Sequence, residues 1–284
     1  MFRSENISLK PFTTIGVGGC ADYLIEAYNL GELTDAIHFA KAKQLPYHIL
    51  GKGSNTLFHD DGYRGVVILN KCQKIEWKLP FIEVEAGFSF SLLGIQTAKK
   101  GWSGLEFAAG IPASVGGAIY MNAGACGSET ANPLRQVRFL EEDGSLKTYL
   151  KTEVEFSYRY SSFQKKKGVI VSALFEVAQD PGAKERQRNI LEYRTRTQPY
   201  SDPSAGCIFR NPQGASAGAL IEASGLKGAS VGGASVSHLH ANFIVNRNGA
   251  SRADILKLAK HVQETVYEKS GYQLEMEVRA IDYE

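Results

Sequence analysis

Residues 101–128 read GWSGLEFAAGIPASVGGAIYMNAGACGS and carry seven glycines in 28 residues. A second window, residues 206–233, carries seven more, so 14 of the 29 glycines of the chain fall in two short segments. Glycine adopts positive φ without strain and lets another group approach the backbone closely. The two windows therefore indicate loops at which a ligand or a second backbone comes close to the chain.

The composition of the chain is that of an ordinary globular protein. Of its 284 residues, 43% are hydrophobic and 22% are charged. With 32 Lys and Arg against 30 Asp and Glu, the net charge is only +2. Nucleic-acid affinity rests on clustered excess cations, and the one basic run, Lys165-Lys166-Lys167, is interpreted as a solvated turn. We therefore expect no nucleic-acid partner.

The cysteines, histidines and apolar runs also limit the class of protein. Cys20, Cys72, Cys126 and Cys207 form no Cys-x-x-Cys pair, which argues against a zinc site or a disulfide framework and fits a reducing compartment. The histidines form no His-x-x-x-His pair, and no metal is expected. The first residues contain no apolar signal core, and no apolar run approaches the ~20 residues of a membrane span. We expect a soluble, cytoplasmic protein without membrane insertion.

Capping residues and hydrophobic periodicity predict an α+β fold. Helices are expected at residues 29–43, 90–100, 184–195, 217–224 and 251–270. Strands are expected at residues 47–50, 66–69, 82–86, 137–140, 169–177, 242–245 and 273–281. The last of these strands is predicted from strict alternation of apolar and charged residues from Leu274 to Ala280. Helices and strands interleave without βαβ repetition, and Gln198–Pro203 predicts a domain boundary.

The turn Gly51-Lys52-Gly53-Ser54-Asn55 follows a predicted strand. A Rossmann fingerprint is disfavoured, because it needs a third glycine and a helix that opens at once. Successive backbone N–H groups in a glycine-rich turn nevertheless form an anion-binding nest, to which Ser54 and Asn55 add side-chain donors. An ordinary turn remains an equal alternative from this segment alone.

Two serines match the Gly-x-Ser-x-Gly pattern of hydrolases, Ser216 and Ser230. The nucleophile elbow requires a buried strand immediately before the serine, and neither serine has one in the sequence. Serine hydrolysis is therefore kept only as an alternative function. Arg159 lies among aromatic and hydroxyl residues, where a surface arginine stacked on a tyrosine is the simplest interpretation.

Several motifs, taken together and in order, carry more information than any one of them. The principal motifs are Leu50–Leu57, Gly104–Glu106, Gly110–Ala118 and Met121–Ala125. Further motifs are Thr13–Gly19, Tyr158-Arg159-x-Ser161, Ala205–Pro212, Gly225–Gly228, His240–Phe243 and Leu274–Arg279. Over nearly its whole length the chain resembles the UDP-N-acetylenolpyruvoylglucosamine reductase family, the flavoenzymes of peptidoglycan precursor synthesis.

The resemblance implies a two-subdomain FAD-binding module of the vanillyl-alcohol-oxidase/PCMH type and a smaller α+β substrate-binding domain. We place the FAD-binding subdomains at residues 1–72 and 73–182 and the substrate-binding domain at residues 183–284. No insertion is evident between Ser161 and Arg196, which resembles the shorter type of the family that lacks a substrate-covering loop. We expect a monomer.

The resemblance also implies two half-reactions. NADPH reduces a noncovalently bound FAD, and the hydride then passes from flavin N5 to the enolpyruvyl group of the UDP-sugar substrate, which gives UDP-N-acetylmuramate. This addition drives negative charge onto the substrate carboxylate, so preplaced donors are needed. Arg159 and Glu277 match the family positions for that task, and Glu277 can serve only if it is protonated or paired with a donor. Cys207 matches the position of the proton donor.

The remaining site residues are also carried over from the family. The residues expected to bind FAD are Gly51, Lys52, Gly53, Ser54, Asn55, Thr56, Gly110, Ile111, Ser114, Gly116, Gly117, Asn122 and Gly124. The residues expected to bind substrate are Tyr158, Arg210, Asn211, Lys227 and His240. The chain departs from the commoner pattern at Cys207, where many members have serine, and at Ala113, Ser114 and Cys126. Another FAD oxidoreductase of the same fold, and a flavin-binding protein without turnover, remain alternatives.

Overall fold

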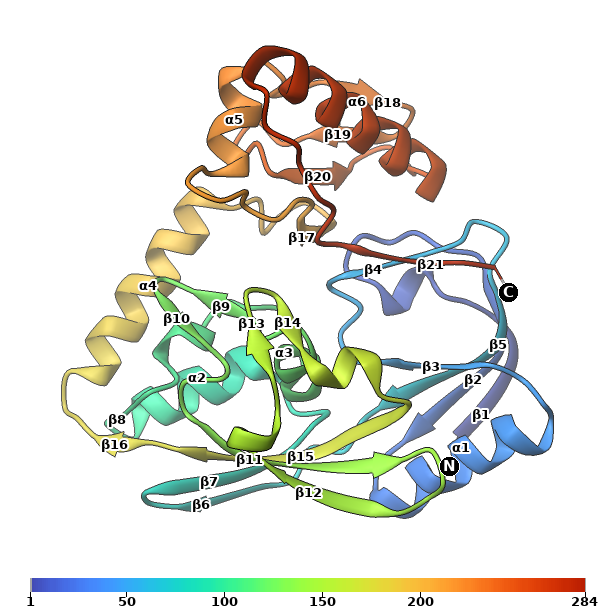
Figure 1. Ribbon diagram of the computed structural model, residues 1–284, viewed down its shortest axis with the longest axis vertical. Helices are drawn as coiled ribbons and strands as arrows, with labels where there is room; N and C mark the ends of the chain where they lie inside the picture. The colour runs from blue at the N-terminus through green and yellow to red at the C-terminus, as the bar shows by residue number, and fades with distance from the viewer. Residues whose placement is uncertain (1, 284) are drawn as a thin grey trace. The chain divides into compact units, whose positions relative to one another are not determined.

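The structure is a computed structural model that describes residues 2–283 (Figure 1). Its chain divides into two compact units, each assembled from several stretches of sequence. The first unit comprises Leu24–Lys52, Val66–Arg194 and the residues up to Ser4. The second unit comprises Glu5–Tyr23, Gly53–Gly65 and the chain from Thr195 onward. The mixture of helices and strands confirms the α+β class, and the finer division at residues 72 and 182 stays a prediction.

A five-stranded antiparallel sheet forms the centre of the first unit, in the order β12-β11-β15-β7-β6. Its strands are β6 (Ile75–Lys78), β7 (Phe81–Glu85), β11 (Leu134–Glu141), β12 (Leu146–Leu150) and β15 (Gly168–Glu176). The helices α2 (Phe90–Lys99) and α3 (Val115–Tyr120) lie along one side of this sheet (Figure 1). Phe90 from α2 packs 6.5 Å from Phe175 of β15 and 5.8 Å from Phe107, measured between ring centroids.

A four-stranded sheet has the order β1-β2-β5-β3. Its strands are β1 (Phe2–Ser8), β2 (Cys20–Ala27), β3 (Tyr47–Leu50) and β5 (Tyr63–Asn70). β3 pairs in parallel with β5, and α1 (Leu30–Ala42) provides the crossover that precedes β3. The side chain of Asn29 accepts a hydrogen bond from the Glu32 N–H, so the predicted N-cap of this helix is confirmed.

Short ladders and turns complete the first unit. The ladders are β8 (Trp102–Ser103) with β16 (Ala178–Gln179), β9 (Gly124–Ala125) with β10 (Ser128–Glu129), and β13 (Phe156–Ser157) with β14 (Tyr160–Ser161). The 3-10 turns are η2 (Glu106–Ala108), η3 (Lys151–Glu153) and η4 (Ser162–Lys165). The helix α4 (Ala183–Thr197) leads toward the second unit. The rings of Trp77 and Trp102 lie 5.9 Å apart, and Lys100 Nζ lies 4.9 and 5.6 Å from their centroids.

The core of the second unit lies between a four-stranded sheet and two helices. The sheet has the order β17-β20-β19-β18, with β17 (Ser204–Cys207), β18 (Ser230–Val231), β19 (Ala234–Val236) and β20 (Phe243–Asn246). The helices are α5 (Ala217–Ala223) and α6 (Arg252–Ser270), and η1 (Lys10–Phe12) is a short turn in the same unit. Ser251 caps α6: its Oγ accepts from the Asp254 N–H, and its own N–H donates to the Asp254 carboxylate. Gly271 ends the helix at a φ of +74°. Both predicted ends of α6 are confirmed.

The predicted strand at residues 273–281 is wrong over most of its length. Only Arg279–Ile281 forms a strand, β21, which pairs in parallel with β4 (Thr56–Phe58). Leu274 and Val278 are buried in the core of the second unit, which explains the alternation. Residues 273–278 form a single bridge, between Met276 and Phe209, and otherwise pair with no strand. The alternation of apolar and charged residues here reflects burial of one side of the segment and does not indicate a strand.

Candidate functional site

In the second unit, two segments far apart in the sequence run antiparallel, and one carries the predicted acid, Cys207, while the other carries the predicted carboxyl group, Glu277. The Glu277 N–H donates to the Ile208 carbonyl at 2.9 Å, and the Arg210 N–H donates to the Glu275 carbonyl at 2.9 Å. Phe209 and Met276 form the bridge between these bonds. This register places Glu277 beside the residue that follows Cys207. Both side chains are partly exposed.

The predicted phosphate turn meets the same two segments. Asn55 Nδ2 donates to the Glu277 carbonyl at 3.2 Å, and the Arg279 N–H donates to the Asn55 carbonyl at 3.1 Å. A Cβ on Gly206 would lie 3.9 Å from the Ser54 carbonyl oxygen, so the residue before Cys207 passes close to the turn. The second unit therefore gathers Ser54, Asn55, Cys207 and Glu277 around one crossing of three segments.

The backbone of this turn has donors to offer. Among the described residues, the N–H groups from Gly51 to Asn55 donate no hydrogen bond within the protein. Gly53 has a φ of +62°, and a Cβ there would collide with the Phe12 carbonyl oxygen, so glycine is required. A run of free amide N–H groups is the donor set that a phosphate accepts from a protein backbone. These residues fit a bound pyrophosphate such as that of FAD.

The Gly110–Gly117 segment has a different structure. Its N–H groups are largely used inside the protein: Gly110 donates to Ser91 Oγ at 2.8 Å, and Gly116 donates to the Ala86 carbonyl at 2.8 Å. Ser114 caps α3 by accepting from the Gly117 N–H at 3.2 Å. A Cβ on Gly51 would collide with Ser114 Oγ. The glycines at Gly51 and Gly116 therefore serve close packing of neighbouring segments.

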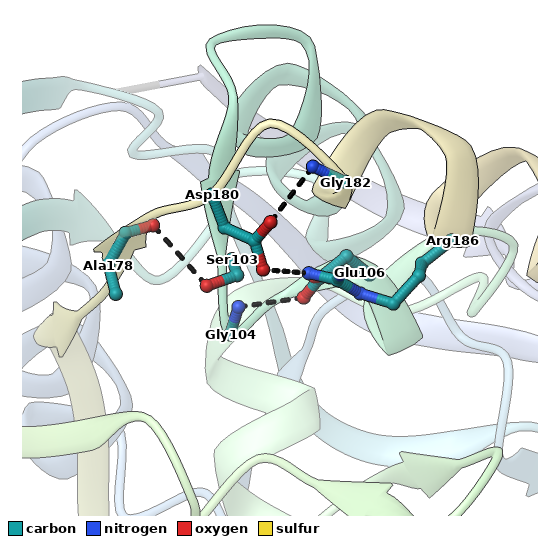
Figure 2. Close-up of polar contacts among 7 residues, drawn as sticks. All are labelled: Ser103, Gly104, Glu106, Ala178, Asp180, Gly182 and Arg186. Carbon is teal, nitrogen blue, oxygen red and sulfur yellow. Dashed lines mark hydrogen bonds and ion pairs between the residues drawn. The ribbon is translucent and has the colours of Figure 1, made fainter.

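A polar network supports the segment that leads into Gly110 (Figure 2). Glu106 Oε1 accepts from Arg186 Nη2 at 2.7 Å and Nε at 3.2 Å, and Glu106 Oε2 accepts from the Gly104 N–H at 2.7 Å. Asp180 accepts from Arg186 at 2.6 Å, and hydrogen bonds from Arg186 and from the Gly182 N–H lower the pKa of its carboxyl. The motif containing Glu106 was noted in the sequence, but neither its partner Arg186 nor the network was foreseen.

A second arginine of α4 reaches the same segment. Arg194 Nη2 donates to the Gly110 carbonyl at 3.2 Å. Arg186 and Arg194 are eight residues apart, so they lie on the same side of the helix about two turns apart. One side of α4 therefore holds both ends of the Glu106–Gly110 segment.

Arg159 lies at the tip of the hairpin formed by β13 and β14. Its φ of +57° is in the left-handed region, which is uncommon for a residue with a side chain and recurs at functional sites. Its guanidinium lies 4.9 Å from the centroid of the Tyr158 ring and donates to the Gly124 carbonyl at 3.4 Å. The stacked surface arginine considered from the sequence is thus present, but on a strained backbone.

Asn122 is fully buried directly behind this hairpin. Its Nδ2 donates to the Ser157 carbonyl at 3.0 Å, and its Oδ1 accepts from the Ala131 N–H at 3.0 Å. Both the nitrogen and the oxygen of this side chain, which the family resemblance assigns to FAD binding, therefore form hydrogen bonds within the protein. Its structural contribution is to fix the strand that leads to Arg159.

The residues predicted to bind substrate lie in the second unit, except Tyr158. Asn211 Oδ1 accepts from the Ala217 N–H at the start of α5, and Lys227 pairs with Glu222 at 2.6 Å. His240 Nδ1 accepts from the Asn242 N–H at 3.3 Å. Arg210 Nε is buried and has no hydrogen-bond partner in the described structure, which leaves one donor for a ligand.

The serines of the hydrolase alternative do not have the setting that a nucleophile needs. Ser216 is the N-cap of α5 and follows an irregular segment rather than a strand, and Ser230 lies on the edge strand β18. Within residues 2–283, no group of three or more His, Cys, Asp or Glu side chains is arranged to hold a metal ion. In the same range, no helix combines the length and hydropathy needed to cross a bilayer.

Comparison with known proteins identifies the family of the chain. Residues 21–149 match the family described as "FAD binding domain", and residues 198–281 match "UDP-N-acetylenolpyruvoylglucosamine reductase, C-terminal domain". These matches and the α+β fold define the class of FAD-binding oxidoreductases. The crystal structure of UDP-N-acetylenolpyruvylglucosamine reductase from Thermus caldophilus is 37% identical and covers 99% of this chain and 98% of its own, with a TM-score of 0.84.

Curated relatives extend the similarity to higher identity. The UDP-N-acetylenolpyruvoylglucosamine reductase of Protochlamydia amoebophila is 49% identical over 98% of this chain and 94% of its own length. That of Chlamydia muridarum is 46% identical over 99% of this chain and 95% of its own. The chain belongs to the UDP-N-acetylenolpyruvoylglucosamine reductase family.

Proposed function

We propose that the protein uses FAD to reduce the enolpyruvyl ether of UDP-N-acetylglucosamine to UDP-N-acetylmuramate, with NADPH as the source of electrons. The observation that carries the proposal is the crossing in the second unit, where Cys207 and Glu277 lie beside Ser54 and Asn55. It brings the backbone of the two segments that carry the predicted acid, Cys207, and the predicted carboxyl group, Glu277, next to the turn that fits a pyrophosphate. Family membership supports the substrate.

Bound FAD would supply the hydride that reaches the substrate double bond. The amide run from Gly51 to Asn55 would hold the FAD pyrophosphate, and the packed Gly110–Gly124 segment would let the cofactor lie close to the backbone. The protein's own side chains then have to stabilise the charge that develops on the substrate carboxylate and deliver one proton to carbon.

Three side chains would divide that work. Arg159 would donate hydrogen bonds to the developing anion on the substrate carboxylate. Glu277 would share that task in its protonated form, since an ionised carboxylate would repel the anion. Cys207 would give its Sγ proton to the substrate carbon, for which a thiol is a better acid than a serine hydroxyl.

The sugar and the pyrophosphate of the substrate would lie on Arg210, Asn211, Lys227 and His240, and Tyr158 would also contact the substrate. The buried Nε of Arg210 supports an anionic ligand there. None of the four cysteines forms a disulfide within the described residues. We propose that the protein acts in the reducing cytoplasm, as a monomer.

The test is a spectrum of the purified protein followed by separate half-reactions. The protein should be yellow, release free FAD on acid treatment, be bleached by NADPH without oxygen, and recover its colour when the enolpyruvyl substrate is added. A colourless protein that cannot be reconstituted with FAD, or a reduced flavin that the substrate fails to reoxidise, contradicts the proposal.

A further inference from the structure

The conformation of Arg159 has to be maintained by its neighbours. It is the second residue of the two-residue loop between Ser157 of β13 and Tyr160 of β14, at a φ of +57°. A left-handed residue with a side chain persists only when surrounding contacts over-determine it. The contacts that hold this hairpin therefore decide where the guanidinium points.

Gln164 bonds the backbone of Arg159 itself. Its side-chain Nε2 donates to the Arg159 carbonyl at 3.2 Å and to the Tyr120 carbonyl at 2.9 Å. A carboxamide nitrogen has two protons, and the two carbonyl oxygens are stronger acceptors than the Met121 sulfur, which lies 3.7 Å from the same nitrogen. Gln164 belongs to η4, the turn that follows β14, and its side chain folds back onto the loop. It thus connects the peptide of Arg159 to the end of α3.

Two further bonds join the hairpin to the same short segment. Ser161 Oγ donates to the Tyr120 carbonyl at 2.8 Å, and Asn122 Nδ2 donates to the Ser157 carbonyl at 3.0 Å. Ser161 and Asn122 are fully buried. Each strand of the hairpin is therefore tied to Tyr120–Asn122, within the glycine-rich segment proposed to lie along FAD.

We infer that Gln164 is a positioning residue for Arg159: by holding the Arg159 carbonyl against the end of α3, it fixes the direction of the guanidinium toward the substrate carboxylate. The inference rests on the function proposed above. Ser161 and Asn122 fix the two strands, whereas Gln164 alone among these three bonds the loop residue itself.

The closing experiment compares Gln164→Glu and Gln164→Met with Lys167→Met. The first variant keeps the shape but places a carboxylate against two carbonyl oxygens, and the second removes every donor. Lys167 is exposed three residues away and serves as the matched control. We expect both Gln164 variants to be reduced by NADPH at the parental rate within twofold. Reoxidation by the enolpyruvyl substrate should slow by about 10- to 100-fold, and Lys167→Met should match the parent.

A second measurement does not depend on catalysis. Phenylglyoxal labels accessible arginines, and peptide mass spectrometry would give the labelling rate of Arg159 relative to the exposed Arg188. That ratio should rise at least threefold in both Gln164 variants and stay constant in Lys167→Met. FAD affinity should remain near the parental value in both variants. The thermal midpoint should remain near the parental value in Gln164→Met, because the packed core is untouched.

Each outcome decides the question. Parental reoxidation rates with unchanged Arg159 labelling overturn the inference. Equal slowing of both half-reactions, together with a lower thermal midpoint, shows a merely structural role and also overturns it. If the parent itself is reduced but not reoxidised by substrate, the proposed function fails, and the labelling ratio still decides whether Gln164 holds Arg159.

Discussion

Glu106 and Arg186 form a hydrogen-bonded ion pair in which one carboxylate oxygen accepts from both Nη2 and Nε of the guanidinium, at 2.7 and 3.2 Å. The Glu106 side chain is only 11% exposed, whereas that of Arg186 is 49% exposed. The pair joins the first turns of α4 to the segment that enters Gly110 (Figure 2). Its loss therefore leaves a nearly buried carboxylate without its cation.

Arg186→Gln should lower the free energy of unfolding by about 2 kcal/mol, since a buried charged group that loses its partner keeps its desolvation cost. Arg188→Gln is the control on the same helix. Arg188 Nε lies 3.7 Å from Glu192, both side chains are more than two-thirds exposed, and the expected loss is within about 0.5 kcal/mol. Denaturant unfolding gives the free energy of unfolding of both variants. Equal losses of that free energy would show that the Glu106–Arg186 pair stabilises the protein no more than the exposed Arg188–Glu192 pair does.

Arg159→Ala should separate the two half-reactions. NADPH should still bleach the flavin at the parental rate, while reoxidation by the enolpyruvyl substrate should slow by ~10²-fold or more, the loss typical of a missing oxyanion donor. Anaerobic stopped-flow absorbance measures both rates. Arg159→Lys keeps the charge without the planar fork and should recover part of the loss. Slowing of both rates by the same factor would contradict the assignment.

Cys207→Ala should leave flavin reduction by NADPH intact and block formation of the reduced sugar product. Cys207→Ser should retain substantial turnover, because serine is the residue that the family resemblance leads us to expect at this position. Cys20→Ser, at an exposed thiol, is the control for loss of a cysteine as such. Product formed per reduced flavin, measured by chromatography, is the readout. Turnover by Cys207→Ala at the parental rate would show that another group is the acid.

Cys72 should make the first unit sensitive to alkali. Burial, and secondarily the charges of Glu85 and Glu32, raises the pKa of its thiol to about 12. In the unfolded chain a thiol has a pKa near 8.5. Below that pH both states are protonated and the stability contribution is complete. Between about pH 8.5 and 12 only the unfolded state releases the proton, so stability falls by about 1.4 kcal/mol per pH unit.

Denaturant unfolding from pH 8 to 10.5 checks this slope. Cys72→Ala removes the thiol, so the stability difference between parent and variant should shrink as the pH rises above about 8.5. A constant difference across that range would mean that the thiol titrates alike in both states. Iodoacetamide at pH 8 should label exposed Cys20 and Cys126 and spare Cys72 in the folded protein.

Much of the fold could be predicted because its signals are local. Asn29 and Ser251 mark the starts of their helices, and Gly271 marks the end of α6, through hydrogen bonds to residues only a few positions away. Capping residues of these types allow such helix ends to be predicted from sequence. In contrast, α3 was not predicted, because its two glycines disfavour a helix. It forms because Ser114 caps it and Val115, Ala118 and Ile119 are buried. That burial depends on β7 and β15, which are distant in sequence.

The candidate site was predicted from family motifs, and the structure adds relationships that no motif contains. Sequence placed Cys207 and Glu277 seventy residues apart, and only the register of their segments makes them neighbours. Gly51–Asn55 and Gly110–Gly117 were both expected to bind FAD. Within residues 2–283, however, the N–H groups of Gly51–Asn55 donate no hydrogen bond, whereas those of Gly110–Gly117 are largely used. Hydrogen-bond partners depend on tertiary contacts, which composition does not report.

The adjacent rings of Trp77 and Trp102 give the protein a built-in optical label. They are the only two tryptophans of the chain, and both belong to the first unit. Tryptophan emission therefore reports the unfolding of that unit, whereas far-ultraviolet circular dichroism follows the helices of both. If the two signals change at different denaturant concentrations, the units unfold separately, and a single coincident transition identifies one cooperative molecule.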